Sequence, residues 1–181
     1  KKILIADGHH RYSVSRAYYG LTRDRSADTV LIYLCPEEDK GLVVLPTHRV
    51  VEDPKILDRA ALFCRISRCK TRQECLRRLS ASSNPYAFGF FEKAYYLAEP
   101  RGPQGCRSGL CVEWLSKNLL KDVPPDLLAY TPDAEKAVKW ARQKKGAALF
   151  VKPLRVAQIR RAVAAIGLLP QKTTYFYPKI A

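Results

Sequence analysis

A short apolar run near the start of the chain, Ile3-Leu-Ile5, breaks at Asp7-Gly8 and is followed at once by two adjacent histidines. Bulky and β-branched residues favour a strand, and the pattern after Gly8 is that of a helix that reaches Tyr19 and ends at Gly20. The sequence therefore predicts a strand, a glycine turn and a helix start in direct succession.

The start of such a helix is suited to binding an anion. The backbone N–H groups of Gly8, His9 and His10 would point toward one pocket, at the positive end of the helix dipole. Arg11 would add a bidentate donor for a phosphate or carboxylate, and the histidines would shuttle a proton near neutral pH. Asp7 would hold a metal ion or orient a histidine. The plainer alternative is that Asp7 caps the helix, Gly8 makes the turn and the histidines are surface or packed residues.

Length and composition describe an ordinary globular protein. A chain of 181 residues that is 47% hydrophobic can form one domain or two small ones with a real core. Its longest apolar runs, such as 42–45 and 147–151, are far too short to cross a bilayer, and the start does not resemble a signal peptide. We therefore predict a cytoplasmic protein with no membrane partner.

The six cysteines have irregular spacing. A structural zinc site would require Cys-x-x-Cys pairs, whereas the closest cysteines, such as 64 with 69 and 106 with 111, are separated by four or more residues. A disulfide between the last pair is a further alternative. Unlinked thiols are the favoured interpretation, so we expect no metal site formed by the cysteines and no zinc.

The formal net charge of +15 would attract nucleic acid nonspecifically at low salt. The basic residues of 136–145 and 155–161 lie at helical spacing opposite apolar positions, which is typical of the solvated faces of amphipathic helices. No helix-turn-helix, RNA-binding or zinc-finger pattern is present. A noncatalytic nucleic-acid-binding or regulatory module is therefore the alternative function and not the favoured one.

The remaining pattern predicts a mixed α/β (α+β) fold, with a mixed sheet and flanking helices. Predicted strands cover 28–34, 41–45, 62–66, 86–91, 94–97 and 147–151, and predicted helices cover 54–61, 71–79, 110–120, 134–145 and 154–166. The first two strands would form a hairpin, as would 86–91 with 94–97. The loop 100–109, rich in glycine and proline, would separate a subdomain 1–100 from a subdomain 101–181.

A second basic pair, His48-Arg49, follows the predicted strand 41–45 and is expected to leave the sheet at its end. We predict that these two side chains converge on the pocket of His9, His10 and Arg11 and bind the same phosphate or nucleotide. Glu52 and Asp53 come next and would either bind Mg²⁺ or cap the helix 54–61.

The block 172–179 near the end of the chain alternates aromatic and β-branched residues and predicts a strand. Its aromatic residues are explained by ordinary packing. Lys172, Thr173 and Tyr175 also offer donors for a phosphate and a ring for a base or ribose, so we include them among the candidate nucleotide-binding residues.

Three separated blocks resemble the signature motifs of the DUF1015 family, a group of prokaryotic proteins. They are Ile5-Ala-Asp-Gly-His-His-Arg-Tyr12, Gly41-Leu-Val-Val-Leu-Pro-Thr-His-Arg-Val-Val51 and Pro170-Gln-Lys-Thr-Thr-Tyr-Phe-Tyr-Pro-Lys179. The segment 63–112, with its many cysteines and arginines, fits the resemblance loosely. Family members are about twice as long, with the first block near the middle. The resemblance therefore implies that this chain is the C-terminal half of a longer protein.

The run Asp7-Gly-His-His-Arg11, here called the DGHHR box, is also similar to the phosphate-binding box of the ParB/sulfiredoxin superfamily. The archaeal ADP-dependent free serine kinases carry a DGHHR version of it. This resemblance implies phosphate handling, a nucleotide with Mg²⁺ as cofactor, and a kinase-like phosphotransferase acting on a small molecule. In those proteins a catalytic carboxylate comes from segments before the box.

Overall fold

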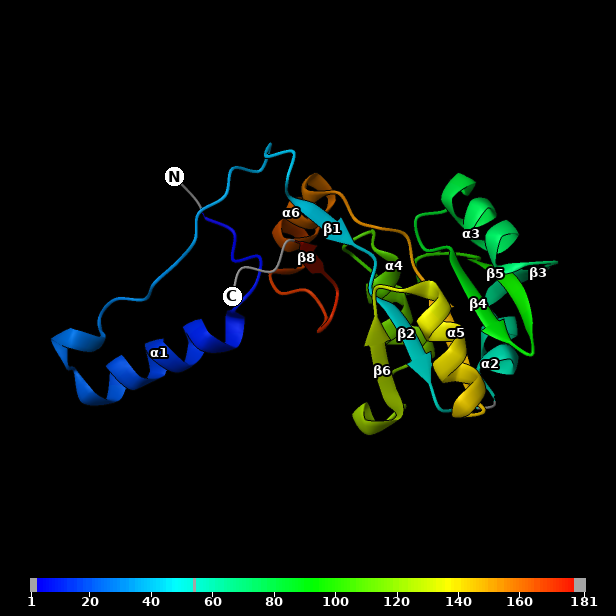
Figure 1. Cartoon of the computed structure of the whole chain (residues 1–181), viewed down its shortest axis with the longest axis horizontal. Helices are drawn as coiled ribbons and strands as arrows, with labels where there is room; N and C mark the ends of the chain where they lie inside the picture. The colour runs from blue at the N-terminus through cyan, green and yellow to red at the C-terminus, as the bar shows by residue number, and fades with distance from the viewer. Residues whose placement is uncertain (1–2, 54, 178–181) are drawn as a thin grey trace. The chain divides into compact units, whose positions relative to one another are not determined.

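The computed structural model describes residues 3–53 and 55–177 (Figure 1). By its internal contacts the chain forms two compact units, one of residues 1–43 and 176–181 and one of residues 44–175. We call them unit 1 and unit 2 and describe each by itself. The predicted boundary at residue 100 falls inside unit 2, whereas the observed boundaries fall within the strands β1 (Val43–Leu45) and β8 (Tyr175–Tyr177).

Unit 2 is built on a sheet of six strands in the order β3-β5-β4-β7-β2-β6 (Figure 1). The strands are β2 (His48–Val51), β3 (Cys64–Cys69), β4 (Phe88–Glu92), β5 (Ala94–Pro100), β6 (Leu128–Thr131) and β7 (Ala147–Phe150). The α/β class with flanking helices is confirmed. The sheet is not mixed as predicted, because every ladder between its strands is antiparallel.

The helical crossovers explain this difference. The sequences β3-α3-β4 and β6-α5-β7 each join two strands that point the same way, as helix–strand alternation predicts. In each case one strand that runs the opposite way, β5 or β2, lies between the two. These are split β-α-β units, in which parallel strands are not neighbours.

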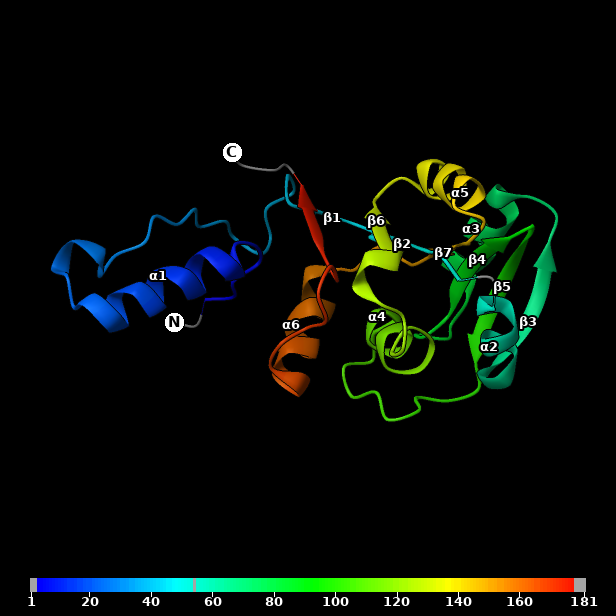
Figure 2. The ribbon, with the colours of Figure 1, turned by 90° about the horizontal axis from the view of Figure 1, so that it is seen from below.

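Helices cover both faces of the sheet (Figure 2). One face packs against α3 (Arg72–Ala81) and α5 (Ala134–Gln143), which bury Cys75, Leu79 and Ala141. The other packs against α2 (Ile56–Phe63), α6 (Val156–Ile166) and α4 (Cys111–Trp114), which continues as a π-helix over Leu115–Leu119. Unit 2 also contains a 3₁₀ turn, Pro125–Leu127. The core is thus two apolar layers on either side of one sheet.

Local signals explain where several elements begin and end. The Thr71 hydroxyl accepts from the Glu74 N–H at 3.1 Å and caps α3, and the Asp133 carboxylate caps α5 by accepting from the Glu135 N–H at 2.7 Å. A Cβ on Gly146 would lie 2.0 Å from the Val51 carbonyl oxygen, so only glycine fits after α5. The strand predicted at 62–66 begins later, at Cys64, because α2 extends to Phe63.

The predicted hairpin of 86–91 with 94–97 is present as β4 and β5. The hairpin predicted for 28–34 and 41–45 is wrong. Residues 28–34 form no strand, and the side chain of Leu31 is fully exposed. Strand β1 pairs with β8 instead, and Pro178 and Lys179 of the predicted last strand lie outside the described residues.

Unit 1 contains the helix α1 (His9–Thr22) and a short 3₁₀ turn, Arg25–Ala27. The strand predicted at residues 3–5 does not form, and these apolar side chains are exposed. A strand requires a neighbouring edge to pair with, and no described segment of unit 1 offers one to these residues. Helix α1 buries none of its residues.

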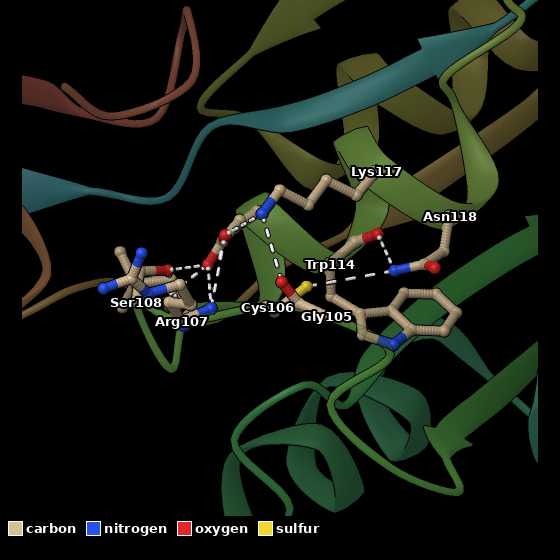
Figure 3. A network of polar contacts seen from close by, with 9 residues as sticks. Gly105, Cys106, Arg107, Ser108, Trp114, Lys117 and Asn118 are labelled. Atoms are coloured by element: carbon tan, nitrogen blue, oxygen red, sulfur yellow. Dashed lines mark hydrogen bonds and ion pairs between the residues drawn. The ribbon is translucent and has the colours of Figure 1, made fainter. Parts of the chain in front are cut away.

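The loop 101–110 is fastened to the rest of unit 2 by a buried carboxylate (Figure 3). The Glu113 side chain accepts hydrogen bonds from the backbone N–H groups of Arg107 and Ser108 and from the Ser108 hydroxyl, at 2.6 to 3.3 Å. It also pairs with Lys117 at 2.6 Å. The loop is therefore an ordered part of this unit. In the described part of the chain, no helix is long and apolar enough to span a bilayer.

Candidate phosphate-binding site

The DGHHR box forms the N-terminal turn of α1, as predicted, although no strand precedes it. Gly8 is the N-cap residue, with φ 82° and ψ 19°, a left-handed conformation that favours glycine. The first hydrogen bond of the helix runs from the Tyr12 N–H to the Gly8 carbonyl at 3.0 Å. Gly8 is therefore required by the geometry of the turn.

The amides of His9, His10 and Arg11 precede this first hydrogen bond, so the helix itself gives them no acceptor. The N-cap residue, a glycine, has no side chain to cap the helix, and the first turn contains no acidic residue. The Asp7 carboxylate accepts from the Gly8 N–H at 2.9 Å and so helps to shape the turn. The N-terminus of α1 thus keeps the donors that an anion would require.

The Arg11 guanidinium folds back over the glycine turn. A Cβ placed on Gly8 would lie 3.4 Å from Nη2, 3.6 Å from Nε and 3.8 Å from Cζ of Arg11. Arg11 and both histidines are exposed. A guanidinium and three backbone amides therefore lie together at the positive end of a helix, open to a ligand.

The second basic pair lies in unit 2, and there the prediction is wrong in one respect. His48 and Arg49 do not leave the sheet, because they are the first residues of β2, an inner strand between β6 and β7. Only 4% of His48 and 2% of Arg49 is exposed. No local pattern predicted this burial, because a polar pair before two valines resembles a strand end.

Arg49 is a buried cation held by backbone carbonyls. Its Nη1 donates to the Thr47 carbonyl and its Nη2 donates to the Lys172 carbonyl at 3.4 Å, while the guanidinium lies 5.9 Å from the centre of the Tyr130 ring. No ion pair among the described residues includes Arg49. Burial lowers the pKa of this guanidinium. A buried charge without a counter-ion is costly, so an anion would stabilise this position.

His48 is in a different chemical state from the one expected of a cationic ligand. Burial, followed by the charge of Arg49, lowers its pKa to about 4. Its Nδ1 accepts from the Val151 N–H at 3.3 Å, and its ring packs edge-on against that of Phe150, with the two ring centroids 5.6 Å apart. His48 is thus neutral near pH 7, with its proton on Nε2, and offers a ligand one neutral donor.

The C-terminal block contributes to the surroundings of Arg49. Lys172 supplies the carbonyl just described, and the buried Thr173 hydroxyl donates to the Pro170 carbonyl at 2.5 Å. Tyr175 lies half-buried in β8. The Thr47 hydroxyl is buried with no partner among the described residues, and sequence reasoning missed it although it lies inside the Pro-Thr-His-Arg motif. The structure therefore brings two of the three blocks together within unit 2.

Neither of the two carboxylates that follow β2 is arranged as a metal ligand. Glu52 pairs with Lys144, and Asp53 pairs with Arg59 and accepts from the Lys55 N–H at 2.8 Å. Helix α2 begins at Ile56 and its N-cap residue is Lys55, so Asp53 lies two residues before the cap and does not cap the helix itself. Within 3–53 and 55–177, no three histidine, cysteine, aspartate or glutamate side chains gather as metal ligands.

All six cysteines are free, and burial raises the pKa of Cys64, Cys75 and Cys111 to about 12. These three are therefore protonated thiols near neutral pH, a form that binds metal poorly. That no zinc is bound stays a prediction. So does the convergence of His48 and Arg49 with the DGHHR box, because the two lie in different units.

A model of the family described as "Protein of unknown function (DUF1015)" matches residues 1–143. The chain belongs to the DUF1015 family. The match covers most of this DUF1015 chain and includes the DGHHR box and the His48-Arg49 pair. No curated protein matches the sequence.

Two solved structures share the fold of this DUF1015 chain. One is a conserved hypothetical protein from Pyrococcus furiosus, with a TM-score of 0.55, 14% identity, and coverage of 96% of this chain and 69% of that one. The other is a free serine kinase in complex with AMP, with a TM-score of 0.58, 14% identity, and coverage of 96% and 66%. The chain thus spans about two thirds of the length of either structure.

Proposed function

We propose that this chain provides a phosphate-binding site for a nucleotide or another phosphorylated small molecule. The observation that carries the proposal is the position of the Arg11 guanidinium over Gly8, beside the amides at the start of α1. Backbone amides at a helix N-terminus and a bidentate guanidinium are the donors that phosphate oxygens accept from most readily. The fold shared with a free serine kinase in complex with AMP supports a nucleotide as the ligand.

The reaction that fits these groups best is phosphoryl transfer, in which the protein mainly positions the reactants and neutralises charge. Arg11 and the amides of His9 and His10 would hold one phosphate. His9 or His10 would take the proton from the acceptor hydroxyl, because both imidazoles are exposed at the same turn. Unit 2, taken by itself, would offer an anion the Arg49 guanidinium and the Nε2 proton of His48, with Lys172, Thr173 and Tyr175 nearby as further candidate ligand-binding residues.

A nucleotide would bring Mg²⁺ with it. Mg²⁺ is usually held by one or two carboxylates and by phosphate oxygens, so a single carboxylate at the turn is sufficient. Asp7 is the carboxylate of the DGHHR box, and its Oδ1 is oriented toward the glycine turn by the Gly8 N–H. Asp7 would therefore hold the ion or, in its absence, orient a histidine.

The direct test is a calorimetric titration of the whole chain with AMP. Replacing Arg11 by alanine should weaken binding by roughly 1.5–3 kcal/mol, about ten- to a hundredfold, because a charge-assisted bidentate contact is lost. The fold should be kept, since the residue is exposed. The matched control is Arg16→Ala, which removes another exposed arginine of α1 and should leave the affinity unchanged.

Two results would contradict the proposal. One is an Arg11→Ala variant that binds AMP as tightly as the original chain. The other is an equal loss of affinity in Arg16→Ala or in Arg77→Gln, an exposed position of α3. Either would mean that diffuse positive charge, rather than the helix terminus, attracts the ligand.

A further inference from the structure

A concave site on unit 2 is lined mainly by cations. It has a volume of about 530 Å³ and lies where the end of β3, the β4–β5 hairpin and the last turn of α5 meet. Its four charged side chains are Arg68, Lys70, Lys93 and Arg142, and its walls include the rings of Phe91 and Tyr95. No acidic residue lines it. We call it the hairpin pocket.

Several basic residues of unit 2 are paired with carboxylates, whereas the four cations of the hairpin pocket are not. Arg59, Arg65, Arg72, Arg78 and Lys144 each form an ion pair. No ion pair of the described residues includes Arg68, Lys70, Lys93 or Arg142. Like charges around one concavity repel one another and focus a positive potential within it, which a bound anion would neutralise.

Two packed aromatic rings form part of the wall of the pocket. Phe91 and Tyr95 are paired across β4 and β5, with ring centroids 4.9 Å apart. The Arg142 guanidinium lies over the Phe91 ring, 5.2 Å from its centre. Lys93 is the turn residue of the hairpin and has a positive φ of 63°. The contact with Phe91 holds the Arg142 guanidinium beside the paired rings, so this side chain would need little reordering on binding.

From this geometry we propose that the hairpin pocket binds a small polyanion that carries two or more phosphate groups. Arginine and lysine are the side chains that bind phosphate, and four of them converge here around a volume typical of small-molecule sites. A nucleic-acid surface would spread its cations along a ridge or groove. The pocket lies wholly within unit 2, so the proposal is independent of the DGHHR box.

The test is a calorimetric titration of the whole chain with phosphate, pyrophosphate and tripolyphosphate at fixed ionic strength. We expect affinity to rise along this series, because each added phosphate can meet a further cation. The double variant Lys93→Gln/Arg142→Gln should weaken tripolyphosphate binding at least tenfold. The matched control, Lys139→Gln/Arg77→Gln, removes two exposed charges from α5 and α3 outside the lining and should bind as the original chain does.

Thermal unfolding of each variant shows whether it is folded. If the loss of the Arg142–Phe91 contact unfolds the double variant, the exposed Arg68→Gln variant replaces it and should weaken binding severalfold. Equal losses in the pocket variants and the control would overturn the proposal in favour of diffuse charge.

Two further results would overturn the proposal as well. Loss of tripolyphosphate binding in Arg11→Ala alone would assign the ligand to the DGHHR box. Displacement of tripolyphosphate by a single-stranded oligonucleotide that itself depends on Lys93 and Arg142 would make the pocket a nucleic-acid contact.

Discussion

His48 shows how one buried side chain couples folding to pH. Its pKa is lowered from the usual 6.5 to about 4. Between these two pH values His48 is therefore protonated in the unfolded chain and neutral in the folded chain. The stabilisation is therefore complete above pH 6.5 and is lost as pH falls toward 4. It amounts to about 3 kcal/mol on the usual conversion of pKa differences.

The first prediction follows from this difference in proton uptake. In the His48→Asn variant, the unfolding free energy should fall less between pH 6.5 and pH 4 than it does in the original chain. Urea unfolding at several pH values measures this difference. His10→Asn, at an exposed position of α1, serves as the control and should keep the dependence. An unchanged slope in His48→Asn would show that the pKa of His48 is the same in the folded and the unfolded chain.

A second residue-scale prediction concerns Gly146. Because a Cβ there would lie 2.0 Å from a backbone oxygen of Val51, the Gly146→Ala variant must displace β2 or α5. We expect a loss of more than about 2 kcal/mol of unfolding free energy, because moving the backbone of either β2 or α5 would disturb the packing of the sheet. Gly105→Ala, with open space around its Cβ but a φ of 77°, should cost less. Equal costs at the two positions would mean that only backbone strain matters.

At the scale of elements, Glu113 holds the loop 101–110 against α4. Burial alone would raise the pKa of this carboxyl, but hydrogen bonds from Lys117, Ser108 and Arg107 lower it to about 2, from the usual 4.5. The stabilisation is present above pH 4.5 and is lost as pH falls through 2, and it amounts to about 3 kcal/mol.

The corresponding prediction is that Glu113→Gln loses about this amount of unfolding free energy at pH 7, and much less near pH 3. Glu135→Gln is the control, because that carboxylate is 77% exposed and its ion pair with Arg72 contributes little. Urea unfolding at the two pH values measures both. A constant deficit at both pH values would mean that the amide disturbs packing rather than removing a charge.

Elements with strong local signals were predictable from the sequence. The caps of α3 and α5 and the β4–β5 hairpin depend on residues close together in the chain, and all three are present. The order of the sheet depends on pairing between distant strands, which no local pattern encodes, so its antiparallel ladders were missed. The apolar runs 3–5 and 28–34 have the composition of strands, but neither pairs with another strand among the described residues, and this absence of pairing is not encoded locally either.

The Gly8 turn of unit 1 and the surroundings of Arg49 in unit 2 were predictable to different extents. The turn at Gly8 follows from a glycine before a helical pattern, and the structure confirms that conformation. The burial of Arg49 was not predictable, because it results from β2 lying between β6 and β7. The orphan hydroxyl of Thr47 likewise arises only from the packing of the sheet.

For the whole molecule, the formal net charge of +15 predicts a response to salt. Mutual repulsion destabilises the folded chain at low ionic strength, and screening reduces it as the Debye length falls. The thermal midpoint should therefore rise from about 10 mM to 150 mM sodium chloride. It should rise further with sodium phosphate at equal ionic strength if the anion sites are real. Equal midpoints in the two salts would count against specific binding of inorganic phosphate.

The central claim is that the N-terminal turn of α1 binds phosphate, and mapping backbone amide shifts during an AMP titration tests it most directly. Nitrogen-15 correlation spectra of the whole chain should show the largest saturable changes at His9, His10 and Arg11, because these amides would donate to the phosphate. The changes should disappear in Arg11→Ala. Saturable changes confined to the residues of the hairpin pocket, with no change at the His9, His10 and Arg11 amides, would contradict the claim.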